Sequence, residues 1–348
     1  MTGGALRVGL DVGGTKVLGI LLDGDAVRHT VRLRTRPGTE GVVDTAAAAV
    51  QDLCAAHGVR PADLAGVGLG LPGIVEPRAG TVSHAVNLRM DLPAVPIGPL
   101  LSARLGGVPV TVENDLNAAT LGAADLLGLR DMALLALGTG VAAGLVLDGR
   151  LRRGHAGAAG EIGHLPYRPG GPVCACGQRG CLELYASGSA LDAAWTSSGG
   201  TRPDGALPGG TPSGGIPAGG AWPAQEVFAA AAAGDAAAVA VRTAFADAVA
   251  TAVRFLVLTC DVTHIVLGGG VAQVGLPLRD AVADAIARQT AGSPFLGSLA
   301  IADRLAVAPA GVPVGAIGAA LATRGDDVPG RLVRSGAVVL AAAPGDQG

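Results

Sequence analysis

The chain has 348 residues, of which 49% are hydrophobic and 15% charged, and its mean hydropathy is +0.48. This composition excludes a highly charged disordered chain and allows about two domains with a sizeable core. The formal net charge of −3 shows no basic excess, so we expect no nucleic-acid partner and no membrane partner. The first residues, M-T-G-G-A-L-R-V-G-L-D, lack the pattern of a secretory signal, which favours a cytoplasmic protein with reduced thiols.

The first part of the chain alternates strand and helix patterns. Apolar runs bounded by Gly and Asp predict strands at 6–10, 17–22, 26–33, 66–71 and 108–112. Apolar residues at helical spacing predict helices at 44–56 and 116–127. This order predicts an α/β domain.

The second part repeats the opening pattern. We expect strands at 133–137, 144–147 and 264–267, and helices at 236–258, 278–289 and 315–323. An apolar strand, a glycine turn and a second apolar strand thus occur twice, about 125 residues apart, which indicates a duplicated domain. Residues 197–220 differ, because more than half of them are Gly or Pro. Such a segment cannot bury enough apolar area to offset its ordering entropy, so we expect a flexible surface insertion there.

Three glycine-containing segments have the chemistry of nucleotide binding. In D-V-G-G-T-K, residues 11–16, backbone N–H groups beside the glycines would surround a phosphate, and the leading carboxylate would hold Mg²⁺ through water. The segment L-G-T-G, residues 137–140, would grip a polyphosphate from the other side, and the three glycines at 268–270 would accept a base or ribose. Tight hairpins and, at 268–270, a helix-entry turn are the alternative interpretations.

The segment E-N-D-L-N, residues 113–117, stands between a predicted strand and a predicted helix. A carboxylate at the carboxyl end of a strand points into the crevice where α/β sheets bind ligands. Asp115 would there accept a proton from an attacking hydroxyl, with Asn114 as a hydrogen-bonding partner. Alternatively the two residues are helix caps, and on local grounds this second interpretation is favoured.

Three cysteines stand within eight residues, and a histidine precedes the first of them by ten. Cys174, Cys176, Cys181 and His164 together provide the donors of a closed, tetrahedral, structural zinc site. Disulfides or inert thiols are the alternative, but a reducing compartment and the dense spacing favour zinc.

Two carboxylates neighbour this cysteine cluster in the sequence. Glu161 lies in G-E-I-G-H, and Glu183 follows Cys181 by two residues. Carboxylates accept strong charge-assisted hydrogen bonds, so with His164 they would bind a polyol such as a sugar. Solvated surface acids are the alternative interpretation.

The motifs D-V-G-G-T-K, E-N-D-L-N-A-A, L-G-T-G, G-E-I-G-H and C-A-C-G-Q-R-G-C-L-E, in this order, resemble those of the ROK family of sugar kinases and repressors. The resemblance covers roughly Val8 to Leu321. It implies a two-domain α/β fold of the actin and hexokinase type, a duplicated ribonuclease H-like unit with a small zinc knuckle. We expect an N-terminal domain over 1–125, joined by the helix near 312–324, and a C-terminal domain over 126–311 with its zinc loop at 164–183.

The resemblance also implies roles for named residues. Asp115 would be the catalytic base, and the sugar would be bound by Asn87, Asn114, Asp115, Glu161, His164 and Glu183. Structural Zn²⁺ would be held by His164, Cys174, Cys176 and Cys181. ATP, with Mg²⁺, would be bound by Asp11, Gly13, Gly14, Thr15, Lys16, Gly138, Thr139, Gly140, Gly268, Gly269 and Gly270.

Within this family the sequence favours a kinase. The repressors carry a helix-turn-helix domain before the first phosphate motif, and here Asp11 follows only ten residues. We expect ATP-dependent phosphorylation of glucose at the 6-hydroxyl, by a homodimer or homotetramer. The alternatives are an N-acetylhexosamine or fructose kinase and a non-catalytic sugar-sensing regulator. They stay open because Val141, Ala142 and Ala143 stand where many members have more glycine, and because no Trp accompanies Asn87.

Overall fold

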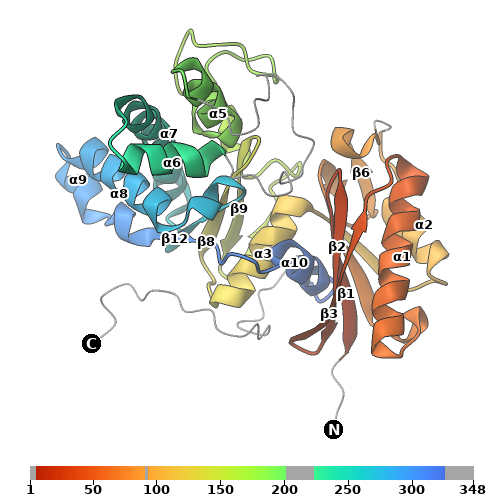
Figure 1. The fold of residues 1–348 in the computed structure, drawn as a ribbon. Coiled ribbons are helices and arrows are strands. Elements are labelled where there is room, and N and C mark those ends of the chain that lie inside the picture. The colour runs from red at the N-terminus through yellow and green to blue at the C-terminus, as the bar shows by residue number, and fades with distance from the viewer. Residues whose placement is uncertain (1–4, 91–92, 201–222, 326–348) are drawn as a thin grey trace, which may run out of the picture.

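The computed structural model describes residues 5–90, 93–200 and 223–325. These form two five-stranded β-sheets and a small two-stranded one, with helices between and outside the two large sheets (Figure 1). Residues 197–200 are the first four residues of the expected insertion. They form the last residue of helix α5 (Gly188–Ser197) and the turn that follows it. Residues 201–220 of that insertion lie outside the described residues.

The first sheet has five strands in the order β3-β2-β1-β4-β7. They are β1 (Leu6–Val12), β2 (Lys16–Asp23), β3 (Ala26–Arg34), β4 (Gly66–Leu71) and β7 (Val110–Asn114). Strands β1, β2 and β3 form an antiparallel meander, whereas β4 and β7 continue from β1 in parallel. In this register Gly70 pairs with both Asp11 and Glu113, so the carboxyl ends of three strands meet at one edge of the sheet.

The second sheet repeats this topology in the order β10-β9-β8-β11-β12. Its strands are β8 (Met132–Leu137), β9 (Val141–Leu147), β10 (Arg150–Arg152), β11 (His264–Gly268) and β12 (Leu305–Val307). Again three antiparallel strands are followed by two parallel ones. The repetition confirms the predicted fold class, a duplicated α/β fold.

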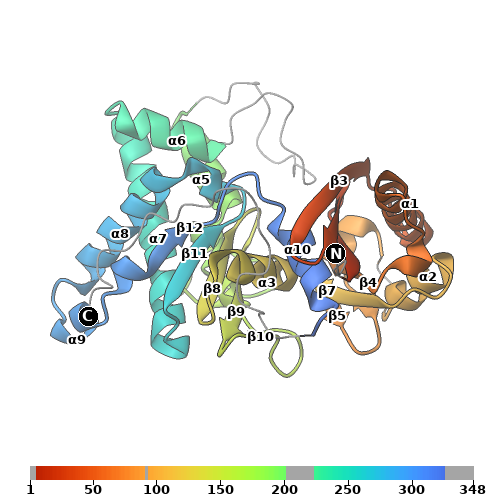
Figure 2. The same ribbon diagram turned by 90° about the horizontal axis from the view of Figure 1, so that it is seen from below.

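Two helices, α3 (Asp115–Leu127) and α10 (Val314–Ala322), lie between the sheets, as the view in Figure 2 also shows. Their small residues allow a very close approach. A Cβ added to Gly68 of β4 would lie 1.7 Å from the Ala319 carbonyl oxygen, and one added to Gly318 would lie 1.7 Å from the Ala118 carbonyl oxygen. The abundance of glycine and alanine therefore has a packing function in this layer.

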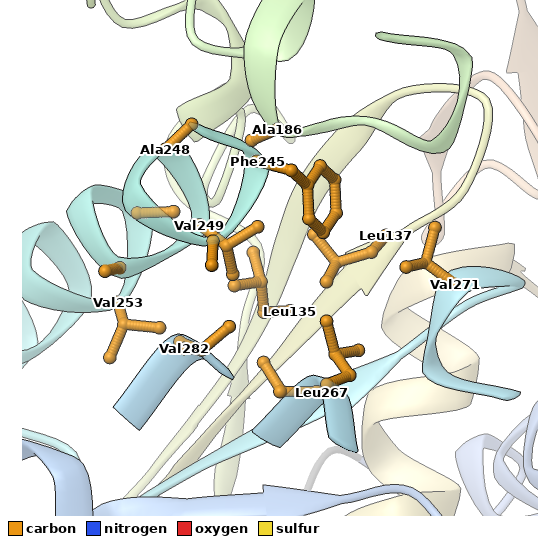
Figure 3. Close-up of a cluster of buried hydrophobic side chains, with 14 of the residues drawn as sticks. Leu135, Leu137, Ala186, Phe245, Ala248, Val249, Val253, Leu267, Val271 and Val282 are labelled. Atoms are coloured by element: carbon orange, nitrogen blue, oxygen red, sulfur yellow. The ribbon is translucent and has the colours of Figure 1, made fainter. Parts of the chain in front are cut away.

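Further helices cover the outer faces of the two sheets. Helices α1 (Thr39–His57) and α2 (Ile97–Arg104) pack on the first sheet. The second sheet is covered mainly by α7 (Ala236–Cys260) and α8 (Leu276–Thr290), with α4 (Glu183–Ala186), α5, α6 (Pro223–Ala232) and α9 (Pro294–Ser298) around them. In Figure 3, Leu135 of β8 and Leu267 of β11 pack against Phe245 and Val249 of α7.

Helix α7 is long and apolar enough to cross a membrane by length and composition alone. Half of its most apolar window is buried inside the protein, and Phe245, Val249 and Val253 are at most 2% exposed. Its apolar character is therefore explained by its place in the core of the second half of the chain.

The predicted elements are all present among the described residues, with shifted ends. The strand expected at 108–112 is displaced to Val110–Asn114, and the following helix begins at Asp115. Sequence reasoning missed α2, α4, α5, α6 and α9 and the short strands β5 (Ile74–Glu76), β6 (Thr81–Ser83), β10 and β12. These elements are short or lack a clear apolar period.

Candidate functional site

The first glycine turn joins β1 to β2 directly after Asp11. The Gly13 N–H donates to the Lys16 carbonyl oxygen at 2.9 Å, so the segment is a tight hairpin, as the alternative interpretation held. Thr35, which the sequence analysis did not single out, donates its hydroxyl to the Gly13 carbonyl oxygen at 2.6 Å. The Thr35 N–H also donates to the Thr15 carbonyl oxygen at 3.0 Å, so the residue that follows β3 stabilises the turn through two hydrogen bonds.

Asn87 lies beside this turn in the one-turn helix η2 (Val86–Leu88). A Cβ added to Gly14 would lie 2.9 Å from the Asn87 carbonyl oxygen, so only glycine fits at this close approach. The Asn87 side chain is exposed. The structure therefore brings the predicted sugar residue Asn87 next to a predicted phosphate residue.

Asp11 and Asp115 form an electrostatically coupled pair of carboxylates at this sheet edge. Burial and the neighbouring Asp115 charge raise the pKa of Asp11 to about 6, while Lys16 acts in the opposite direction. Burial also raises the pKa of Asp115, opposed by the hydrogen bond that its Oδ1 accepts from the Leu116 N–H at 2.8 Å. A proton acceptor of raised pKa is therefore placed beside a second acid and a phosphate-type turn.

The helix-cap interpretation holds for Asn114 but not for Asp115. Asn114 is the N-cap of α3, and its Oδ1 accepts from the N–H groups of Leu116 and Asn117 at 3.0 and 3.2 Å. Its Nδ2 donates to the Gly73 carbonyl oxygen at 3.1 Å, which fixes the amide orientation. Asp115 is the first helical residue, and its half-buried carboxylate is not needed as the cap.

The second glycine turn joins β8 to β9 and also forms a tight hairpin, because the Gly138 N–H donates to the Gly140 carbonyl oxygen at 3.0 Å. Thr139 at its tip is exposed. The Glu183 Oε2 atom accepts a hydrogen bond from the Val141 N–H at 3.2 Å, and a Cβ on Gly140 would lie 2.3 Å from that oxygen. The predicted sugar residue Glu183 thus touches the predicted phosphate turn.

The third glycine segment lies at the end of β11, next to the second turn. Gly268 pairs with Ala136 of β8. Gly269 has a φ of 81°, and a Cβ added to it would lie 2.5 Å from the Leu137 carbonyl oxygen. Gly270 leads into the short helix η4 (Val271–Val274), so this segment is also a helix-entry turn, as the alternative held. The two turns therefore share one end of the second sheet.

The residues Val141, Ala142 and Ala143, which differ from the family pattern, belong to strand β9. Ala143 is 2% exposed and pairs with Leu135, and its N–H donates to the Gly160 carbonyl oxygen at 2.8 Å. The positions where glycine is replaced therefore lie after the turn, within the paired residues of the sheet. The turn residues Gly138, Thr139 and Gly140 are unchanged.

The predicted zinc ligands come together in space. One donor atom from each of His164, Cys174, Cys176 and Cys181 lies within 4.8 Å of every other. All five cysteines are free thiols, and the Cys176 and Cys181 sulfur atoms are 3.6 Å apart, which contradicts the disulfide alternative. One imidazole and three thiols at these separations fit a tetrahedral zinc ion.

His164 connects this cluster with Glu161. Its Nδ1 atom lies 3.9 Å from the Cys174 sulfur, and its Nε2 atom lies 3.9 Å from a Glu161 carboxylate oxygen. Glu161 precedes the one-turn helix η3 (Ile162–His164), and its carboxylate is exposed. Of the predicted sugar residues, His164 is thus a member of the cluster, while Glu161 lies beside His164 and Glu183 lies beside Cys174.

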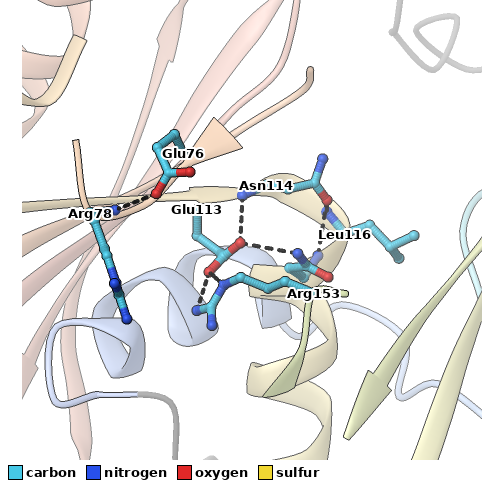
Figure 4. Close-up of polar contacts among 7 residues, drawn as sticks. Glu76, Arg78, Glu113, Asn114, Leu116 and Arg153 are labelled. Carbon is cyan, nitrogen blue, oxygen red and sulfur yellow. Dashed lines mark hydrogen bonds and ion pairs between the residues drawn. The ribbon is translucent and has the colours of Figure 1, made fainter. Parts of the chain in front are cut away.

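Sequence reasoning missed one polar network within the site. Glu113 is 1% exposed and forms an ion pair with Arg153, which follows β10 (Figure 4). It also accepts from the Asn114 N–H and the Asn117 side chain. Glu113 stands in the E-N-D motif, so a signal for it existed, but nothing in the sequence points to Arg153.

The duplicated sheets, the glycine turns and the Cys/His cluster define a two-domain α/β protein of the hexokinase-like class. The profile of the ROK family matches residues 7–325, and the chain belongs to this family. The resemblance seen in the sequence motifs is thereby confirmed.

Proteins similar to this chain include two bacterial glucokinases. The glucokinase of Halalkalibacterium halodurans is 34% identical over 277 residues, covering 77% of this chain and 81% of that protein. The glucokinase of Streptomyces coelicolor is 38% identical over 190 residues, covering 53% of this chain and 57% of that protein, so this match spans little more than half its length. A crystal structure of a ROK family glucokinase from Streptomyces griseus, in complex with glucose and AMPPNP, aligns with a TM-score of 0.71 at 30% identity, covering 92% of this chain and 99% of that one.

Proposed function

We propose that this chain transfers the γ-phosphoryl group of ATP to a hydroxyl of a hexose, with glucose and its 6-hydroxyl as the leading substrate. The observation that carries the proposal is the Asp11–Asp115 pair beside a glycine turn, with a Cys/His cluster flanked by Glu161 and Glu183. The similarity to glucokinases, one of them with glucose and an ATP analogue bound, supports this substrate choice.

Asp115 is the proposed base. It accepts the proton of the sugar hydroxyl while that oxygen attacks the γ-phosphorus, the new O–P bond forms, and the bond to the bridging oxygen breaks to release ADP. The raised pKa of Asp115 makes it a better proton acceptor than an exposed carboxylate. Since phosphoryl transfer asks little covalent chemistry of a protein, positioning supplies most of the rate.

The nucleotide is the proposed ligand of the glycine segments. Gly13, Gly14 and Thr15 with Lys16 would approach the phosphates from the first sheet, and Gly138, Thr139 and Gly140 from the second. Gly268, Gly269 and Gly270 would receive the ribose or base. Asp11 fits a hydrated Mg²⁺, since its carboxylate lies beside a second acid, with Lys16 as a neighbouring cation. When bound, Mg²⁺ supplies charge neutralisation to the phosphates.

The hexose is the proposed ligand of Asn87, Asn114, Glu161, His164 and Glu183. Zn²⁺ would be held by His164, Cys174, Cys176 and Cys181, which fit it in donor type and spacing. The ion would supply a structural cross-link between the loop that carries Glu161 and the helix that begins with Glu183. His164 can contact both the zinc ion and the hexose, because its Nδ1 atom lies near the Cys174 sulfur and its Nε2 atom lies near the Glu161 carboxylate.

Two moving units complete the proposal: residues 1–125 with 312–324, and residues 126–311. Their closure on the substrates would exclude water and limit hydrolysis of ATP. A homodimer or homotetramer and a cytoplasmic location belong to the proposal as well.

A coupled assay of ADP release over a hexose panel tests this function. We expect turnover with glucose, and the panel includes N-acetylglucosamine, N-acetylmannosamine and fructose as the alternative substrates. A protein that binds sugar and ATP but turns over none of them would be a sensing regulator. The intact Gly138–Thr139–Gly140 turn disfavours that outcome, because the alanine replacements lie in β9.

A further inference from the structure

The ion pair between Glu113 and Arg153 connects elements of the two sheets (Figure 4). Glu113 is the fourth residue of β7, in the first sheet, and Arg153 follows β10, in the second. Both Nε and Nη2 of Arg153 donate to the same carboxylate oxygen, Glu113 Oε2, at 2.7 and 2.5 Å. The Glu113 side chain is 2% exposed and that of Arg153 21% exposed, so the pair is largely shielded from water.

The other oxygen of Glu113 fixes the start of helix α3. Glu113 Oε1 accepts from the Asn114 N–H at 2.9 Å and from the Asn117 Nδ2 at 3.1 Å. Asn114 is itself one of these two donors, and Asp115 lies between them in the sequence. The orientation of the Glu113 carboxylate therefore determines where the proposed base and its neighbour lie.

Arg153 fixes the opposite part of the proposed site. Its carbonyl oxygen accepts from the Ala159 N–H at 3.1 Å, which closes the loop 153–159. The next residue, Gly160, bonds to Ala143 of β9 through its carbonyl oxygen, and Glu161 follows. The guanidinium of Arg153 thus anchors the loop that leads to Glu161 and His164.

We propose that Glu113 and Arg153 are a positioning pair that holds the Asn114–Asp115 turn in register with the Glu161–His164 turn. This role rests on the proposed function, because it aligns the base with the sugar ligands of the other sheet. A buried ion pair adds little net stability compared with apolar packing, but its fixed geometry gives orientation. Arginine suits this role, since its planar, multi-donor group constrains direction as a lysine ammonium does not.

Four variants test the pair: Glu113→Gln, Arg153→Lys, Arg153→Met and the double variant of Glu113→Gln with Arg153→Met. Misplacement of reacting groups by about 1 Å costs on the order of a hundredfold in rate. We expect Glu113→Gln and Arg153→Met each to lower kcat/KM for the hexose by about ten- to a hundredfold. KM for the hexose rises and kcat falls, whereas KM for ATP stays within about threefold of wild type. Arg153→Lys should restore part of the loss, and the double variant should be no worse than the poorer single variant.

Arg304→Met is the matched control. Arg304 is 20% exposed and binds Asp261 and the Val262 carbonyl oxygen, both at 2.8 Å, away from the proposed site. It should lose thermal stability without a change in either KM. If the Glu113 and Arg153 variants behave like this control, the pair is merely structural and the positioning role is wrong.

Amide hydrogen exchange tests the positioning pair independently of the proposed function. In Arg153→Met we expect faster exchange at both 113–120 and 153–164, while in Arg304→Met these two segments keep wild-type rates. This readout needs no turnover. A wild-type protein that phosphorylates no hexose would overturn the proposed function alone, whereas unchanged exchange at 113–120 would overturn the positioning pair.

Discussion

The carboxylates of Asp11 and Asp115 repel one another at the edge of the first sheet, and this repulsion adds to burial in raising the pKa of Asp11 to about 6. The folded protein therefore holds the Asp11 proton more tightly than the unfolded chain, whose Asp has the ordinary pKa of 3.8. The stability that protonated Asp11 provides is present at low pH, and it is lost as the pH rises from about 4 through about 6. At neutral pH the site is destabilised by its own charges, and a carboxylate with such a raised pKa is typical of a functional site.

Asp11→Asn removes one of these charges and should stabilise the protein in the absence of Mg²⁺ and nucleotide. From the shift in pKa, we expect a gain in the free energy of unfolding of about 3 kcal/mol at pH 8 and about half of that at pH 5. Urea unfolding of both proteins at the two pH values measures it. Equal stabilities at pH 8 would contradict the electrostatic account of this pair.

Asp115→Asn tests the proposed base. It keeps the shape and a hydrogen-bonding group but cannot accept the proton, so phosphorylation should fall at least about a hundredfold. Sugar affinity, shared with Asn114, Glu161, His164 and Glu183, should weaken far less. Turnover and calorimetric sugar binding on the same two preparations provide the measurement.

Asn114→Ala is the contrasting variant for Asp115→Asn. It removes the side chain that caps α3, so it should lower the free energy of unfolding by about 0.5–2 kcal/mol. Asp115→Asn should cause no such loss, because Asp115 is not the cap. A variant Asp115→Asn with near wild-type turnover would remove Asp115 from the mechanism.

Gly318→Ala tests the packing of the helical layer between the sheets. The added methyl group would lie 1.7 Å from the Ala118 carbonyl oxygen, so α10 and α3 must separate. We expect a loss of at least about 3 kcal/mol in the free energy of unfolding, the upper range for overpacking. Gly297→Ala in α9 is the control, since its Cβ would meet nothing within 4 Å, and it should be neutral or stabilising. Similar thermal unfolding of wild type and Gly318→Ala would show that the layer is more adaptable than its contacts indicate.

The strands next to the glycine turns could be predicted because each is an apolar run that ends at Asp or Gly. The helices α3, α7 and α10 follow from long apolar patterns in the same way. The three-residue strand β12 and the five-residue helix α9 could not be predicted, because their places depend on neighbours distant in the sequence. Local periodicity in so short a segment gives no signal.

In the candidate site, too, local features could be predicted from the sequence and contacts between distant segments could not. The Cys/His cluster could be predicted since its spacing within 164–181 is local and chemically specific. The contacts of Thr35 with Gly13 and of Arg153 with Glu113 span 22 and 40 residues, and only the folded sheets bring them together. Sequence reasoning therefore named the side chains of the proposed site but missed Thr35 and Arg153, which hold its turns in place.

Zinc content provides the last prediction. We expect about one zinc ion per chain, bound by His164, Cys174, Cys176 and Cys181. Cys176→Ser removes one proposed ligand. It should lower thermal stability and abolish activity together, because the proposed metal would cross-link the loop that carries Glu161 and the helix that begins with Glu183. Cys260→Ser is the control, as Cys260 is a free thiol outside the cluster and should leave the zinc content unchanged. Elemental analysis and turnover are measured on the same samples, before and after chelation. Fully active protein without zinc would show that the four side chains need no metal to hold the site.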